Sequence, residues 1–144
     1  MTKLKTRVGL LAAVVGVVGV VAFGAAQASA SNAPMVIQYQ KTCNEFGHCH
    51  GTSNGVTIEM QITSFRATGD AAQLTLTESI TSGNISFTAV LSGTSSPAGF
   101  IVLNGRVTDG SYAGAQVHQR SNYVGGPANA SDWTGELQLM PATA

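Results

Sequence analysis

The chain has 144 residues, only 10% of them charged, and a formal net charge of zero. Three of its seven basic side chains precede residue 8, so residues 31–144 carry four basic and seven acidic groups, a net charge of about −3. Such a segment lacks the basic face that nucleic acid or an anionic membrane surface requires, so neither is expected as a partner. The length allows one domain.

The first thirty residues have the pattern of an export signal. A basic segment, residues 1–7, precedes an uncharged apolar run over residues 8–23, and small residues at Ala28 and Ala30 suit a signal peptidase. We expect residues 1–30 to be a signal peptide cleaved after Ala30, with Ala28 as the second choice, and residues 31–144 to form a single secreted domain. The alternative is an uncleaved membrane anchor, because the apolar run approaches the roughly 18–20 residues that span a bilayer.

Cys43 and Cys49 are the two cysteines of the chain. An even number of cysteines in an exported chain predicts a disulfide bond. The alternative is a metal site, because His48 and His50 flank Cys49. Structural zinc sites usually join ligand pairs from separate segments, whereas here one short loop would supply every ligand. We therefore expect no metal and no cofactor.

The rest of the sequence predicts an all-β fold. Apolar and polar residues alternate, turn residues recur, and no segment has a sustained helical period. Hairpins that follow one another favour a single antiparallel up-and-down β-barrel of about seven to eight strands, and a two-sheet β-sandwich is the alternative. Seven strands are predicted, at residues 35–42, 56–65, 72–80, 84–92, 99–107, 112–124 and 133–140.

Turn residues predict the strand register. A two-residue turn at residues 82–83 would pair Ile80 with Ile85 and set Glu78 opposite Phe87. A three-residue loop at residues 108–110 would oppose Val107 to Ser111 and keep apolar side chains on one face. Alternation then predicts these inward-facing residues: Val56, Ile58, Met60, Ile62, Leu74, Leu76, Ile80, Ile85, Phe87, Ala89, Leu91, Trp133, Leu137 and Leu139.

Glu78 is the candidate residue for chemistry, because it shares the apolar face of its strand with Leu76 and Ile80. Met60 is expected opposite it, if Arg66 pairs with Ala72. A carboxyl group there would have a raised pKa and could act as an acid or orient a ligand. Alternatively, a bulge turns Glu78 outward or a barrel rim solvates it.

A polar stripe is predicted on one face of the strand at residues 112–124. It is interpreted as a solvated outer face or, alternatively, as a contact surface for a partner. The stripe consists of Tyr112, Gln116, His118, Arg120 and Asn122.

Two segments carry a resemblance to known proteins: Asn-Gly-Arg-Val-Thr-Asp-Gly-Ser-Tyr-Ala-Gly-Ala at residues 104–115, and Trp-Thr-Gly-Glu-Leu-Gln-Leu at residues 133–139. The pattern resembles small secreted actinobacterial β-proteins, mostly uncharacterised, which together with the signal pattern points to a bacterial source. The first segment also resembles a hairpin of allene-oxide-cyclase and dirigent-like eight-stranded barrels. The resemblance covers about a quarter of residues 31–144, implies a barrel and transfers no catalytic residue.

The chain has no motif of a nucleophile elbow, a zinc protease or a phosphate-binding loop. We expect a secreted, non-enzymatic β domain that binds an unknown protein, a glycan or a small apolar ligand. One alternative is a cyclase- or isomerase-like barrel enzyme that uses Glu78. Another is a structural component of the cell envelope or spore coat.

Overall fold

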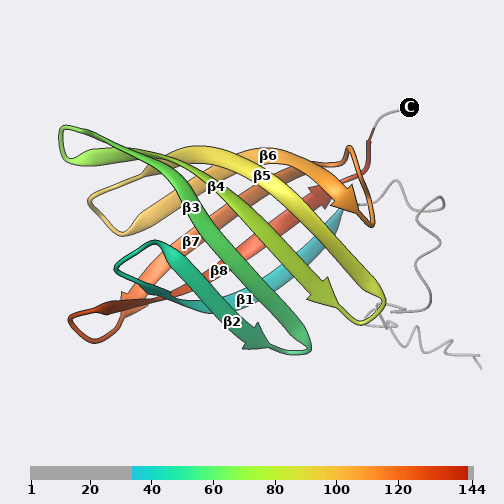
Figure 1. The fold of residues 1–144 in the computed structure, drawn as a ribbon, viewed down its shortest axis with the longest axis horizontal. Coiled ribbons are helices and arrows are strands. Elements are labelled where there is room, and N and C mark those ends of the chain that lie inside the picture. The colour runs from blue at the N-terminus through green and yellow to red at the C-terminus, as the bar shows by residue number, and fades with distance from the viewer. Residues whose placement is uncertain (1–33, 143–144) are drawn as a thin grey trace, which may run out of the picture.

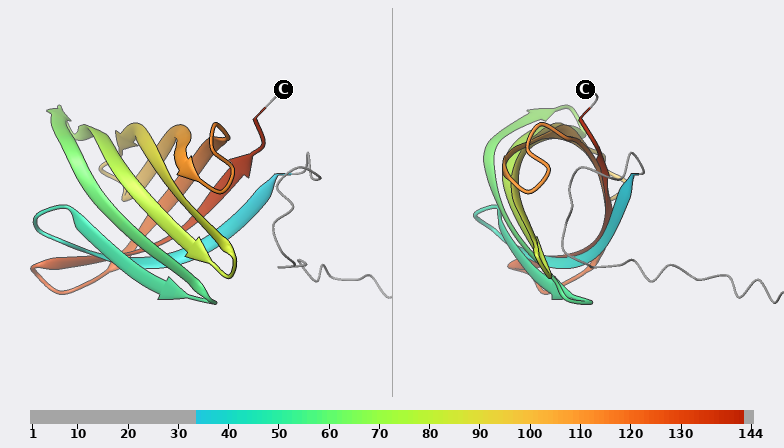
Figure 2. Two further views of the ribbon diagram at one scale, coloured as in Figure 1. Left: turned by 45° about the vertical axis from the view of Figure 1, so that its right-hand side comes forward. Right: turned by 90° about the vertical axis from the view of Figure 1, so that its right-hand side faces the viewer.

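The computed structural model describes residues 34–142, which form a closed antiparallel barrel in which each strand pairs with the next and β8 returns to β1 (Figure 1). The end-on view of Figure 2 shows the strands as a ring. Within the described residues no helix is long and apolar enough to cross a membrane. The strands are β1 (Met35–Asn44), β2 (His48–Ser53), β3 (Val56–Thr68), β4 (Ala71–Ser82), β5 (Ile85–Ser95), β6 (Phe100–Gly110), β7 (Gln116–Gly125) and β8 (Ala130–Met140).

The predicted up-and-down barrel is confirmed, and the sandwich alternative is excluded. The sequence interpretation missed β2, whose segment His-Cys-His-Gly-Thr-Ser contains few strong β-formers. β2 pairs with β3 along its whole length but with β1 only at Thr42–His50 and Cys43–Cys49. At Gly51, β2 comes so close to β1 that a Cβ atom on residue 51 would overlap the carbonyl oxygen of Gln40. Tertiary pairing thus makes a strand of a segment with weak local preference.

The predicted register of the β4–β5 hairpin is wrong by two residues. Ser82 pairs with Ile85, so the turn consists of Gly83 and Asn84. Gly83 has a φ of 57°, a left-handed conformation that suits glycine at the first position of a two-residue hairpin turn. Because the shift is even, the same side chains still point inward. Ile80 therefore lies opposite Phe87, and Glu78 lies opposite Ala89 instead of Phe87.

The β6–β7 connection also differs from the prediction. β6 continues to Gly110, where it pairs with the start of β5, and β7 begins only at Gln116. The loop of residues 111–115 folds back on β6 through hydrogen bonds between Val107 and both Ala115 and Gly114. Leu103 consequently lies opposite Gln119 rather than Ala115. This shift of four residues leaves inward and outward faces unchanged.

One continuous core fills the barrel, and alternation predicted most of it. Trp133, expected in the core, is only half-buried, near one end of the barrel. β1 also contributes two inward-facing residues, Ile37 and Tyr39, that the interpretation did not assign. The buried apolar side chains include Ile58, Met60, Leu74, Leu76, Ile80, Phe87, Ala89, Leu91, Leu103, Val107, Val117, Leu137 and Leu139.

Candidate functional site

A cavity of about 430 Å³ lies at the barrel end that carries the β1–β2, β3–β4, β5–β6 and β7–β8 connections, the left-hand end in Figure 1. Its volume falls within the range of about 300–1,000 Å³ that is typical of sites for small ligands. Phe46 and Phe65 line the cavity and are largely exposed to solvent. The other apolar lining side chains, apart from the two cysteines, are Met60, Ile62, Leu74, Leu76, Ile101, Leu103 and Trp133, and the polar ones are Lys41, Asn44, Glu45, Thr63, Ser64 and Ser131.

Five buried polar side chains gather in the interior of the barrel, apart from a sixth, Ser82, at the end of β4. Tyr39 and Lys41 come from β1, Glu78 from β4, and Gln119 and Ser121 from β7. Each occupies an inward position in the alternation of its strand. Lys41 also lines the cavity, whereas Glu78 is completely buried and does not.

Hydrogen bonds connect four members of this interior cluster. The side-chain amide of Gln119 donates to the hydroxyl of Tyr39 at 2.7 Å and to Oε2 of Glu78 at 2.9 Å. The hydroxyls of Tyr39 and Ser121 are 2.6 Å apart. Oε1 of Glu78 and Oε1 of Gln119 accept no hydrogen bond from the described residues. The interior therefore retains acceptor capacity, which is costly in an apolar environment.

Burial shifts the pKa of each titratable member of the cluster. Desolvation raises the pKa of Glu78 to about 7, although the Lys41 charge and the Gln119 hydrogen bond oppose the shift. Desolvation lowers the pKa of Lys41 to about 8, while the Glu78 charge opposes this shift. The pKa of the Tyr39 hydroxyl is raised, again chiefly by desolvation. The two charges thus compensate each other's burial only in part.

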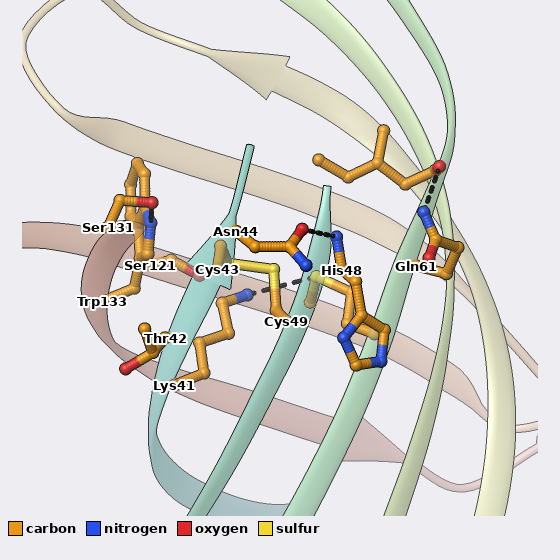
Figure 3. The surroundings of a disulfide bond; sticks show 12 residues. Lys41, Thr42, Cys43, Asn44, His48, Cys49, Gln61, Ser121, Ser131 and Trp133 are labelled. Atoms are coloured by element: carbon orange, nitrogen blue, oxygen red, sulfur yellow. Dashed lines mark hydrogen bonds between the residues drawn. A yellow bond between two sulfur atoms is a disulfide. The ribbon is translucent and has the colours of Figure 1, made fainter. Parts of the chain in front are cut away.

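Lys41 has few acceptors for its ammonium protons. Its single hydrogen bond within the described residues goes to the sulfur of Met60 at 3.4 Å, and Nζ lies 5.2 Å from the centre of the Tyr39 ring. A thioether is a weak acceptor, and an ammonium group has three donors. Figure 3 shows Lys41 extending beside the disulfide bond. A ligand in the cavity that carries a hydrogen-bond acceptor could therefore accept a hydrogen bond from the ammonium group of Lys41.

The sequence interpretation placed Glu78 on an inward face opposite Met60, and both features are confirmed. The pairing of Arg66 with Ala72, on which the position of Met60 was made to depend, is wrong, because a bulge after Ile62 sets Arg66 opposite Gln73. The interpretation did not place Lys41 in the interior. The alternation of Ile37, Tyr39 and Lys41 along β1 indicates that Lys41 faces inward. It does not indicate that Lys41 lies near Glu78, because β1 and β4 face each other only across the barrel interior.

The predicted disulfide between Cys43 and Cys49 is present. It joins β1 to β2, and both of its residues line the cavity (Figure 3). Its formation removes the thiols that the alternative metal site would have used. Within residues 34–142 no group of three or more His, Cys, Asp or Glu side chains is placed to hold a metal ion. The disulfide agrees with an oxidising compartment.

Other polar groups lie on the outside of the barrel. His48 and His50 point outward from β2, and both contact the carboxylate of Glu59 on β3. They line an outer hollow of about 780 Å³, most of whose lining residues are polar. These surface contacts are exposed, which makes their contribution to stability small.

The members of the polar stripe are not all on one strand. Gln116, His118 and Arg120 face outward on β7, where Nδ1 of His118 lies 2.7 Å from Oδ1 of Asn104. Tyr112 lies outside β7, in the loop before it, with a φ of 65° and partial packing against the core. The expected signal cleavage after Ala30 falls outside the described residues.

The fold and interior define the protein as an eight-stranded antiparallel barrel with a cavity at one end and a polar cluster that includes the cavity-lining Lys41. Comparison of the chain with protein-family models, with curated proteins and with solved structures found no match.

Proposed function

We propose that this protein binds a small ligand with an apolar body and one polar acceptor group, without converting it chemically. The observation that carries the proposal is the cavity itself, which combines an apolar wall with the buried ammonium group of Lys41; its other polar lining residues are Asn44, Glu45, Thr63, Ser64 and Ser131. Sites for small molecules commonly combine apolar walls with a few polar groups that fix orientation. In this arrangement Met60 and the leucines contact the body of the ligand, and Lys41 donates to its acceptor.

We also propose that the protein acts outside the cytoplasm. The disulfide supports an oxidising compartment, and the export pattern of residues 1–30 supports secretion. A secreted binding protein would meet ligands of low solubility in water. The exposed Phe46 and Phe65 at the cavity give such molecules an apolar surface to contact first.

The experiment is a titration followed by the fluorescence of Trp133, the single tryptophan of the chain and a lining residue of the cavity. The probes are octanol, which has an apolar chain and one acceptor, and hexaethylene glycol, which has many acceptors and no long apolar chain. We expect a saturable change with octanol alone, weakened in Lys41→Met. His118→Gln, on the outer face, is the control and should bind as the wild type does. No saturable change with octanol would contradict the proposal.

The second candidate function is catalysis of a cyclisation or isomerisation. One observation favours it: the pKa of Glu78 is raised to about 7, close to the value that suits general acid–base catalysis at neutral pH. Because Glu78 does not line the cavity, this function requires the ligand to reach deeper than the cavity does. Chemical conversion of a bound molecule that is lost in Glu78→Gln, while binding is retained, would favour the enzyme.

A further inference from the structure

Lys41 is the single lysine of residues 31–144, since the other two lysines are Lys3 and Lys5. Lysine is among the residues least often fully buried, yet only 4% of Lys41 is exposed. A barrel with one lysine would normally carry it on its surface. Here the single primary amine among the side chains of the domain lies inside, at the cavity.

The surroundings of Lys41 favour the reactive, unprotonated form of an amine. The neighbouring Met60 and the ring of Tyr39 are poor substitutes for water around an ammonium group. Burial lowers the pKa of Lys41 from 10.5 to about 8, so a larger fraction of its amine is unprotonated at neutral pH than in an ordinary lysine. Desolvation of a lysine in an apolar pocket is one of the ways in which proteins activate it as a nucleophile.

The charges of the cluster distinguish between ligand classes. Glu78 already places a carboxyl group in the interior, and its charge acts on Lys41. A carboxylate ligand would add a second negative charge beside a single cation, at a large desolvation cost. An aldehyde or ketone adds no charge and still offers an oxygen acceptor. The titratable groups of the interior, Tyr39, Lys41 and Glu78, therefore favour a neutral carbonyl compound.

We propose that Lys41 captures a small apolar aldehyde or ketone as a reversible imine, an inference that rests on the ligand-binding function proposed above. The nitrogen of Lys41 attacks the carbonyl carbon, and a C–N bond forms. The nitrogen then loses its two protons, and the carbonyl oxygen leaves as water. One carbonyl compound and one amine thus give one imine and one water, with no oxidant or reductant. Hydrolysis by the reverse path releases the ligand.

The test is reductive trapping with octanal and sodium cyanoborohydride at neutral pH, followed by intact mass and peptide mapping. Trapping adds the mass of octanal less one oxygen atom. Mapping separates Lys41 from Lys3, Lys5 and the terminal amine. The reference is a synthetic peptide of residues 36–42, in which the same lysine is exposed to water. We expect Lys41 in the folded protein to be trapped at least about tenfold faster than in the peptide, because more of it is unprotonated.

Two comparisons separate this inference from the binding function. Lys41→Arg keeps a positive charge but cannot form the imine, so it should show no adduct at position 41. If octanol binds the wild type and Lys41 is trapped no faster than in the peptide, the imine proposal is wrong and the binding function stands. If neither octanol nor octanal binds, both proposals are wrong.

Discussion

The side-chain amide of Gln119 on β7 donates to the carboxyl group of Glu78 on β4, 2.9 Å away, and so connects two strands that are not neighbours in the barrel. The same nitrogen donates to Tyr39 on β1. Both bonds cross the interior, where water does not compete for them. Polar contacts, as well as apolar packing, therefore specify how the walls of the barrel face one another.

Replacement of Glu78 by Gln should stabilise the fold at pH 8 and leave its stability at pH 4 almost unchanged. The folded-state pKa of Glu78 is raised from 4.5 to about 7, so the folded protein binds more protons than the unfolded chain over this range. Wild-type stability consequently falls as pH rises from about 4.5 to 7. The glutamine side chain cannot ionise, and we expect a gain of roughly 1–3 kcal/mol at pH 8. Urea denaturation at the two pH values measures it; a variant less stable at pH 8 would contradict the expectation.

Replacement of Lys41 by Met should raise the pKa of Glu78 above 7. Met has a similar length, but it removes the positive charge that partly opposes the desolvation of Glu78. Carbon NMR of the Glu78 carboxyl group, recorded during a pH titration, measures the shift. Arg120→Met removes a cation from the outer face and is the control. An unchanged Glu78 titration in Lys41→Met would show that the two charges do not interact.

The double variant Lys41→Met, Glu78→Gln should be more stable than the wild type near pH 7–8, by roughly 1–4 kcal/mol, because it removes both buried charges at once. The wild-type pair is least favourable there: Glu78 is ionised above about pH 7, and Lys41 stays protonated up to about pH 8. Above pH 8 the wild type should recover, since the folded state then releases a proton that the unfolded chain retains. Thermal denaturation from pH 5 to pH 10 tests this, and a flat wild-type profile would contradict it.

Replacement of Gly135 by Ala should destabilise the barrel and disturb the interior cluster. Gly135 pairs with Tyr39, and a Cβ atom there would overlap the Tyr39 hydroxyl. Tyr39 would have to move away from Gln119 and Ser121, leaving buried polar atoms unpaired, at a cost of about 1–3 kcal/mol. Gly55→Ala, where a Cβ atom would have free space, is a weaker control because its φ of 76° is itself strained for alanine. Denaturation midpoints decide: a Gly135→Ala midpoint equal to that of the wild type would show that Tyr39 can move freely.

Replacement of Trp133 by Ala should cost less than a core substitution. Trp133 is half-buried and packs edge-to-face against the exposed Tyr123, with ring centroids 5.5 Å apart. We expect a loss of about 1–2 kcal/mol, against about 3–5 kcal/mol for Phe87→Ala, which truncates a ring that is 2% exposed. Chemical denaturation of both variants makes the comparison. Equal losses would mean that Trp133 contributes to the core as fully as Phe87 does.

The sequence predicts the class of fold well because period-two alternation reports which side of a sheet is buried. Even the wrong registers at residues 82–83 and 108–110 kept the faces of β5 and β7, since both errors were even. The pattern says less about which strands pair. The segment that became β2 has weak local preference, and its pairing with β3 makes it a strand.

The candidate site could be predicted only in part for the same reason. Glu78 stood out because an acidic residue interrupted an apolar face. The inward position of Gln119 and Ser121 could not be recognised from the sequence, because polar residues occupy both faces of β7. Lys41 follows alternating polar and apolar residues in β1, so it does not stand out in the sequence. Lys41 comes near Glu78 only because the barrel closes, and closure cannot be predicted from a local sequence pattern.

The seam between β1 and β8 joins opposite ends of the described chain, from Met35–Leu139 to Asn44–Ala130, whereas the other neighbouring strands follow one another as hairpins. Because distant segments lose the most chain entropy when they meet, we expect the seam to form late in folding. Because Tyr39 and Lys41 belong to β1, the interior site exists only while the seam is closed. If a ligand binds at Lys41 as proposed, it stabilises the closed barrel, and release of the ligand and opening of the seam become linked equilibria.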